Sequence, residues 1–424
     1  MTMSRSPRGN SLPSMPDDPL QHGTSRRTTL AVLAGLFLGT LALRPQLVGL
    51  GPLLPEIQAD LGISFGVAGL LTTLPVMLMG LFAPLGPWIS GRIGPRDAVA
   101  VCMVAIIGFG LLRPALPGIA AILLTTIGIG IGMGTAGALL PIVVRMRSAA
   151  APARATGAYA AGIVAGSLVA AAAAIPLANA LGGWRATLVV FAVAGLGSLA
   201  CWLLFLRPDA AAHRATGRPP RLPWRSSTAW MLVAVFAVQS LLYYSTISWL
   251  PAVYVERGWN AMDAGNLVAV LHAVGLVAGM ALPFVADRVG TRRSQLVAVS
   301  AVTLAGFLGL ALLPDLGFLW ATITGLGMGA IFPLVLTLPV DVADGPAAVG
   351  ATAAFMLLFG YLISSVGPVG LGTLRDLTGD YSTSLWLLVG LSLVLVGTCL
   401  ALTPARLHRG VHLEGAAAPA SWRP

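Results

Sequence analysis

The chain has 424 residues, of which 57% are hydrophobic and only 9% are charged, and its mean hydropathy is +0.87. A soluble protein of this length needs far more charged side chains to cover its surface, so the composition predicts a membrane protein. The formal net charge is +10. We expect no nucleic-acid partner, because the arginines that supply this charge alternate with apolar runs of about twenty residues.

In chain order, the first element is a polar tail, residues 1–27, which is rich in Ser, Pro and Arg and is predicted to be disordered. Twelve apolar runs follow, most of them long enough to cross about 30 Å of hydrocarbon as helices. They cover residues 28–55, 64–86, 97–113, 117–144, 155–178, 183–206, 228–255, 262–285, 294–313, 316–340, 347–371 and 383–403. The predicted fold class is an all-α membrane protein with twelve transmembrane helices.

The longest polar interruption, residues 207–227, falls between the sixth and seventh runs and is predicted to link two halves, 28–206 and 228–404. Two motifs recur in these halves at nearly the same offset. Arg92-Ile93-Gly94-Pro95-Arg96 returns as Arg288-Val289-Gly290-Thr291-Arg292, and Gly130-Ile131-Gly132-Met133-Gly134 returns as Gly325-Leu326-Gly327-Met328-Gly329. Such a repeat predicts two pseudo-symmetric six-helix bundles, followed by a tail at 405–424.

The basic residues are all arginines, and most of the 25 lie in the two tails and in alternate loops. The opposite loops hold only Arg113, Arg185, Arg257 and Arg375. Because cytoplasmic loops carry an excess of positive charge, we expect both termini in the cytoplasm and the chain in a bacterial inner membrane.

The loops after the second and eighth runs resemble a signature of the major facilitator superfamily, Gly-x-x-x-Asp-Arg-x-Gly-Arg-Arg. The later loop reads Asp287-Arg288-Val289-Gly290-Thr291-Arg292-Arg293, with Pro283 at the first glycine, whereas the earlier loop has Gly91 in place of the aspartate. The resemblance implies a secondary active or facilitative transporter that works by alternating access. It assigns gating of the cytoplasmic ends to Arg92, Asp287, Arg288, Gly290 and Arg292.

Further motifs are similar to those of the cyanate-permease and nitroimidazole-transporter branch of that superfamily. They are Leu43-Arg44-Pro45, Gly51-Pro52-Leu53-Leu54, Gly69-Leu70-Leu71-Thr72-Thr73-Leu74-Pro75, Leu139-Leu140-Pro141, Gly183-Trp184-Arg185, Gln239-Ser240, Tyr243-Tyr244 and Trp249-Leu250-Pro251. This resemblance implies a small anionic or polar solute, such as a cyanate-like ion or an organic anion. The alternative that it implies is an exporter of neutral amphipathic or nitroaromatic compounds.

Arg44 is the one charged side chain that we place near the middle of a run. A permanent cation at that depth costs about 2.5–3.5 kcal/mol on insertion scales, which makes a functional site the default hypothesis. Its guanidinium suits a carboxylate or a small linear anion. The alternative is a structural arginine that binds carbonyls freed by Pro45 and Pro52. All 15 carboxylates lie in tails, loops or helix ends, so we expect none to neutralise Arg44.

The repeat offset relates Arg44 to Gln239, so we expect these two side chains to face each other across the central pathway. Tyr243 shares the face of Gln239, whereas Tyr244 points about 100° away and is interpreted equally well as a packing residue. His272 is the one histidine inside a run. It could shuttle a proton, bind the solute or make an interhelical hydrogen bond.

Three weaker candidates for solute binding are Tyr159, Thr135 and Tyr361 in the fifth, fourth and eleventh runs. Trp249 lies nearer the end of its run, where an aromatic residue of the membrane interface is the simplest interpretation.

No enzyme or cofactor site is predicted. Gly132-x-Gly134-x-x-Gly137 matches the dinucleotide fingerprint by letter, but no strand precedes it. The chain has no lysine for a Walker motif, and Cys102, Cys201 and Cys399 show no metal-ligand spacing. We therefore expect no cofactor, no metal and no enzymatic activity, and a monomer whose partners are a small solute and the lipid bilayer.

Overall fold

The structure is a computed structural model that describes residues 26–148, 152–207, 222–286, 291–343 and 346–403. Within these ranges the chain is almost entirely helical. The elements are α1 (Arg26–Thr40), η1 (Leu41–Leu43), α2 (Pro45–Val48), α3 (Leu50–Leu61), α4 (Phe65–Leu81), α5 (Leu85–Ile93), α6 (Pro95–Ala115), α7 (Ile119–Arg147), α8 (Pro152–Leu181), α9 (Trp184–Phe205), α10 (Ser227–Glu256), α11 (Ala261–Ala286), α12 (Arg292–Leu312), η2 (Pro314–Leu316), α13 (Gly317–Val342), α14 (Pro346–Ser364), α15 (Val366–Thr378) and α16 (Ser382–Ala401).

The helices confirm the predicted fold class. Among the described residues, 11 helices or helix series are long and apolar enough to cross a membrane, and the bent pair of α4 and α5 makes up to 12. The two members of that pair meet at an angle of 63°. The shortest predicted run, 97–113, is part of the 21-residue helix α6, which begins and ends two residues beyond it.

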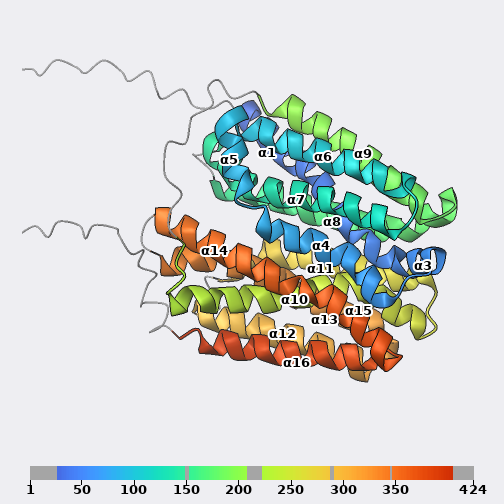
Figure 1. Ribbon diagram of the computed structural model, residues 1–424. Coiled ribbons are helices and arrows are strands. Elements are labelled where there is room, and N and C mark those ends of the chain that lie inside the picture. Colours follow the sequence, from blue (N-terminus) through green and yellow to red (C-terminus); the bar gives the residue numbers. More distant parts are fainter. Residues whose placement is uncertain (1–25, 149–151, 208–221, 287–290, 344–345, 404–424) are drawn as a thin grey trace, which may run out of the picture.

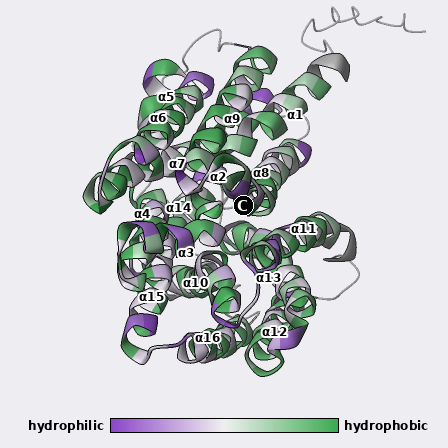
Figure 2. Ribbon diagram, turned by 90° about the vertical axis from the view of Figure 1, so that its right-hand side faces the viewer, coloured by the Kyte–Doolittle hydropathy of each residue, from purple (hydrophilic) through white to green (hydrophobic). Residues whose placement is uncertain are grey.

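The helices lie in two groups (Figure 1): α1 to α9, of the first half of the chain, and α10 to α16, of the second half. The groups meet where α4 packs on α14 and α15, α8 on α11, and α3 on α10. Figure 2 shows that hydrophobic residues predominate along the helices, with hydrophilic residues in a few short stretches.

The glycine motifs of the two halves make equivalent helix contacts. In α7, Gly134 lies against the backbone of Leu78 and Met79 in α4, at a distance that leaves no room for a Cβ atom. In α13, Gly329 lies equally close to Gly275 in α11. Small residues allow the backbones of two membrane helices to approach in this way. The equivalent contacts agree with the internal repeat that the sequence predicts.

Each half also has an arginine that binds the carbonyl end of its last helix. Arg96 donates to the carbonyl oxygens of Leu206 and Leu203 at 2.5 and 2.8 Å. Arg293 donates to the carbonyl oxygen of Leu400 at 3.1 Å from Nε and 2.8 Å from Nη2. A cation at a helix C-terminus is favoured by the helix dipole. These bonds tie the first turn of the third spanning helix of each half, α6 and α12, to the end of the sixth, α9 and α16.

The residues assigned to gating are only partly described. Arg292 Nε donates to Asp341 at 3.1 Å, and the Arg92 guanidinium lies 3.7 Å from the centroid of the Trp88 ring. Asp287, Arg288 and Gly290 lie outside the described residues. The gating role of this set therefore stays a prediction.

Candidate functional site

The span that carries Arg44 is broken into short pieces, since α1 is followed by η1, the four-residue helix α2 and then α3. Pro45 explains the break, because a proline has no N–H group and clashes with the preceding turn. Arg44 lies between η1 and α2, and its carbonyl oxygen accepts from the N–H groups of Leu47 and Val48 at 2.9 and 3.0 Å. The position of Arg44 therefore depends on α2.

Helix α8 packs directly against this break. A Cβ atom at Gly166 would overlap the carbonyl group of Leu41, and one at Gly162 would overlap that of Phe37. Thr40 Oγ1 donates to the carbonyl oxygen of Tyr159 at 3.0 Å. The glycines of α8, one turn apart, thus allow the close contact that supports the broken backbone.

The Arg44 side chain reaches away from its own span toward α4 and α10. Its Nη1 atom donates to Tyr244 Oη at 2.9 Å and to Met79 Sδ at 3.5 Å. No carboxylate forms an ion pair with it in the part of the chain that the structure describes. A guanidinium has five N–H donors, and this one is only half-buried. Arg44 therefore keeps both its charge and donors available for a ligand.

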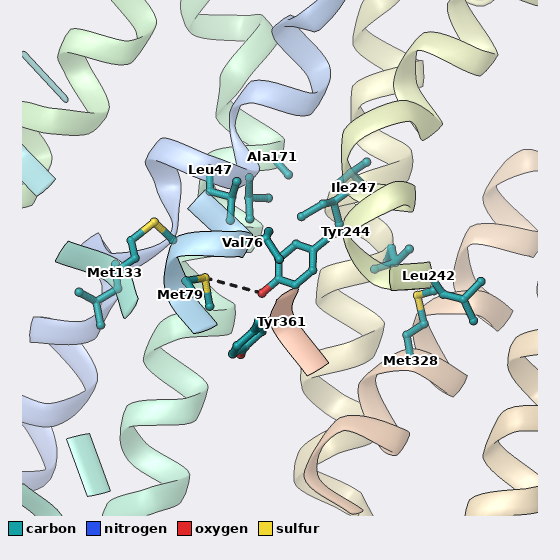
Figure 3. Close-up of a cluster of buried hydrophobic side chains, with 14 of the residues drawn as sticks. Leu47, Val76, Met79, Met133, Ala171, Leu242, Tyr244, Ile247, Met328 and Tyr361 are labelled. Carbon is teal, nitrogen blue, oxygen red and sulfur yellow. Dashed lines mark hydrogen bonds between the residues drawn. The ribbon is translucent and has the colours of Figure 1, made fainter. Parts of the chain in front are cut away.

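Three tyrosines and His272 form a cluster that contacts the Arg44 guanidinium through Tyr244. The ring centroids of Tyr244 and Tyr361 are 6.3 Å apart, and those of Tyr243 and Tyr244 are 5.1 Å apart. The Arg44 guanidinium carbon lies 6.0 Å from the centroid of the Tyr244 ring. Figure 3 shows Tyr244 beside Met79 of α4, with Tyr361 of α14 below both, so both halves of the chain contribute to this cluster.

Two contacts at the His272 ring define its hydrogen positions. Nδ1 is 2.8 Å from the carbonyl oxygen of Val268, and Nε2 is 2.9 Å from Tyr243 Oη. A carbonyl oxygen only accepts, so Nδ1 carries the hydrogen; in the neutral ring Nε2 then accepts from the Tyr243 hydroxyl. In this arrangement Arg44 is the one charged side chain of the cluster.

We expect Tyr244→Phe to weaken anion binding by about tenfold to hundredfold, because the variant removes a charge-assisted hydrogen bond, of about 1.5–3 kcal/mol, that holds the guanidinium in place. The measurement is the solute concentration that half-saturates uptake by the reconstituted protein. Tyr254→Phe is the matched control, since the Tyr254 hydroxyl is buried without a partner among the described residues. Equal effects of the two variants would contradict the role of Tyr244.

The structure gives Arg44 a partner that the repeat did not predict. Gln239 is 3% exposed, and its Oε1 atom accepts from Ser240 Oγ at 3.3 Å. Among the described residues Arg44 pairs with Tyr244, whereas Tyr243 turns toward His272. The facing Arg44–Gln239 pair therefore stays a prediction, and the residue that binds Arg44 among the described residues is Tyr244, which the sequence left equally open as a packing residue.

The prediction for Trp249 was also wrong. Its side chain is 1% exposed, and Nε1 donates to the carbonyl oxygen of Pro368 at 2.7 Å. Helix α10 packs against helices of both halves. An aromatic residue near the end of such a helix is therefore covered by protein and does not reach the membrane interface.

The weaker candidates lie at different places. Tyr361 belongs to the cluster around Arg44, with its ring next to that of Tyr244. Thr135 is buried, and its Oγ1 atom donates to the carbonyl oxygen of Phe82 at 3.4 Å, where α4 bends into α5. Tyr159 is half-buried on α8 beside the break in the first span. Only Tyr361 of these three contacts a residue that contacts Arg44.

A second arginine is buried, contrary to its predicted loop position. Arg113 is 0% exposed in the last turn of α6, and its Nη1 atom donates to the carbonyl oxygen of Gln46 at 2.9 Å. One interpretation of the sequence was that Arg44 binds a backbone carbonyl at the break in the first span. In the structure Arg113 makes such a bond. The sequence feature that could have predicted this burial is that Pro114 and Ala115 extend the apolar run beyond Arg113.

Comparisons with known proteins place this geometry in a family. The sequence profile of the Major Facilitator Superfamily matches residues 32–368. The chain is 35% identical to the cyanate transport protein CynX of Escherichia coli, over 82% of this chain and 91% of that protein. It is 29% identical to the 2-nitroimidazole transporter of Escherichia coli, over 88% of this chain and 96% of that protein.

Among solved structures, a D-xylose–proton symporter matches with a TM-score of 0.70 and 16% identity, over 90% of this chain and 98% of that chain. This likeness shows the fold alone. The chain belongs to the Major Facilitator Superfamily, and it is a multi-pass membrane transporter of small molecules rather than an enzyme.

Proposed function

We propose that this member of the superfamily moves a small anion, of the cyanate class, across a bacterial inner membrane by alternating access. The observation that carries the proposal is Arg44, a half-buried cation in a broken span, which has a tyrosine hydroxyl and a thioether as partners and no carboxylate among the described residues. An anion would supply the missing negative charge through charge-assisted hydrogen bonds. The 35% identity to a cyanate transport protein supports the same solute class.

The orientation that we propose follows from the arginines. Most of them lie on the side that holds both tails, and positive loops stay in the cytoplasm. The turns at residues 62–64 and 379–381 then face the periplasm. We further propose that the chain works as a monomer, with its solute pathway between its own two groups of helices.

Contacts across the two groups support a state that is closed at the proposed periplasmic end. Asp376 of α15 accepts from the backbone N–H groups of Phe65 and Gly66 at 2.9 and 2.7 Å, and so caps the N-terminus of α4. Further along α4, Thr73 Oγ1 donates to the carbonyl oxygen of Ser365 at 2.8 Å. Alternating access requires these bonds to open in the opposite state.

We expect Asp376→Asn to favour the periplasm-open state by about tenfold, because a charge-assisted bond to backbone N–H groups contributes about 1.5–3 kcal/mol. The reporter is a cysteine at Thr72, a buried residue that bonds Ser248 across the two groups, in a chain without Cys102, Cys201 and Cys399. A membrane-impermeant thiol reagent added outside should label this cysteine faster in the variant.

The matched control for this experiment is Asp380→Asn. The Asp380 carboxylate accepts from Ser382 N–H within the same half, so its loss leaves the contact between the groups intact. Unchanged labelling in Asp376→Asn, or equal acceleration in both variants, would contradict the capping role.

The proposal is tested by uptake of radiolabelled cyanate into proteoliposomes, with unlabelled nitrite, formate and a nitroaromatic compound as competitors. We expect the proteoliposomes to take up cyanate and unlabelled small anions to inhibit this uptake. Liposomes without protein should show no such uptake. Absence of saturable anion uptake by folded protein would refute it.

The second candidate is export of nitroaromatic compounds, which the aromatic cluster and the 29% identity to a 2-nitroimidazole transporter favour. In that case stacking on Tyr244 and Tyr361 would dominate binding, and Arg44 would contact the nitro group. Nitroaromatic flux without anion flux in the same liposomes would select this candidate.

A further inference from the structure

We propose that Arg113 is a positioning residue for the solute site, which holds the short helix α2 and thereby places Arg44. The transport readout of this proposal rests on the proposed function, whereas its structural readout does not. Arg113 lies in the last turn of α6 and makes no contact with the Arg44 cluster that the structure records.

The hydrogen bonds that hold α2 in place both involve one residue, Gln46. Its carbonyl oxygen accepts from Arg113 Nη1 at 2.9 Å, and its side-chain Nε2 atom donates to the carbonyl oxygen of Leu188 in α9 at 3.0 Å. Both α6 and α9 thus hold the same residue of the same helix. Gln46 follows Arg44 by two positions, and α2 has no side-chain cap of its own.

Helix α6 also leaves the space that the Gln46 side chain occupies. A Cβ atom at Gly110 would lie 2.9 Å from Gln46 Nε2 and 3.0 Å from its Cδ atom. Gly110 and Arg113 are three residues apart and therefore share one face of the helix. The glycine leaves room for the Gln46 side chain, and the arginine binds the Gln46 backbone.

Stability alone does not explain a buried arginine with so few partners. Arg113 Nε and Nη2, together with Gln46 Oε1, are buried atoms without a hydrogen-bond partner in the described part of the chain. Burying unpaired charged and polar groups is unfavourable, and an apolar side chain of similar volume often gives an equally stable or more stable fold. What the charge adds at this position is one strong, directed bond to the carbonyl of Gln46.

That bond matters because the break removes the ordinary support of the span. In a continuous helix the backbone ladder on both sides would hold a residue in place, but Arg44 has η1 before it and only four helical residues after it. A shift of α2 moves Arg44 relative to Tyr244, and displacements of about 1 Å can cost two orders of magnitude in function at such sites.

The structural test is hydrogen exchange of the purified full-length chain with Arg113→Met, whose apolar side chain has similar length. We expect faster exchange in peptides covering 41–49, where the N–H groups of Leu47 and Val48 bond to Arg44, and unchanged exchange in α10. Arg113→Lys keeps a positive charge with N–H donors and should restore most of the protection. Unchanged exchange in 41–49, or a uniform rise along the chain, would overturn the proposal.

The functional test is cyanate uptake by the same variants. For Arg113→Met we expect the half-saturating concentration to rise about tenfold while the maximal rate stays within about twofold, with partial rescue by Arg113→Lys. Arg185→Met is the matched control, because Arg185 is an exposed arginine paired with Asp60 in the same half. A loss of maximal rate at unchanged half-saturation would overturn the positioning role.

The two proposals fail in different ways. If Arg44→Gln leaves uptake unchanged, the proposed function fails, and the exchange of 41–49 still decides whether Arg113 holds α2. If Arg44→Gln abolishes uptake but Arg113→Met changes neither exchange nor half-saturation, only the inference on Arg113 is overturned.

Discussion

Replacing Arg44 by glutamine is expected to reduce cyanate uptake at least about hundredfold, because the variant removes the one positive charge of the cluster and its charge-assisted bonds to the anion. The amide of glutamine offers two donors in place of five and no charge. The measurement is the initial rate of uptake into proteoliposomes that contain equal amounts of folded protein.

Two further variants make this result specific. Arg44→Lys keeps the charge but loses the planar guanidinium with its paired N–H donors, so we expect it to retain part of the uptake with weaker affinity. Arg185→Gln removes an exposed arginine that pairs with Asp60, and it should transport at the wild-type rate. Normal uptake by Arg44→Gln would refute the assignment of Arg44 as the anion-binding group.

A valine at Gly51 is expected to stop transport without unfolding the protein. Gly51 of α3 lies so close to the carbonyl group of Ile247 in α10 that an added Cβ atom would overlap it. Overpacking of this kind costs about 1–3 kcal/mol or more. Because α3 and α10 belong to different groups of helices, the clash can be relieved by separating the groups at the proposed periplasmic end.

The expected shift toward the periplasm-open state is about tenfold to hundredfold, which follows from that energy. Faster labelling of the cysteine at Thr72 from outside, together with loss of uptake, would show it. Gly197→Val in α9 is the matched control, since nothing lies within 4 Å of a Cβ atom at that position. Wild-type uptake by Gly51→Val, or equal loss in the control, would contradict the prediction.

The contacts of α10 show where sequence reasoning about the site failed. Helical spacing correctly separates Tyr243 from Tyr244, but it does not say which face meets Arg44. Helix α10 packs against helices of both groups, with Gln239, Tyr244 and Trp249 all buried. A helix that is mostly covered by its neighbours and apolar around its circumference has no polar face to identify its orientation, so only the tertiary structure selects Tyr244.

The broken span explains the second failure. The offset of the repeat relates Arg44 to Gln239 only if both spans are regular helices. Pro45 interrupts the first span and α10 continues through the corresponding position, so the two backbones differ where the repeat relates them. Arg113 was misplaced for a simpler reason: helix ends within apolar runs are uncertain by a few residues.

The sequence by itself determined the class of this protein. The cost of exposing polar backbone to lipid allows only helices or closed barrels to cross a membrane, so long apolar runs of this kind specify the helices directly. It also singled out Arg44, because a charge inside such a run is conspicuous. The sequence did not show that Tyr244 binds this charge or that the buried Arg113 holds the backbone beside it. Both contacts join segments that are far apart in the chain, so they depend on how α2 and α10 pack against their neighbours.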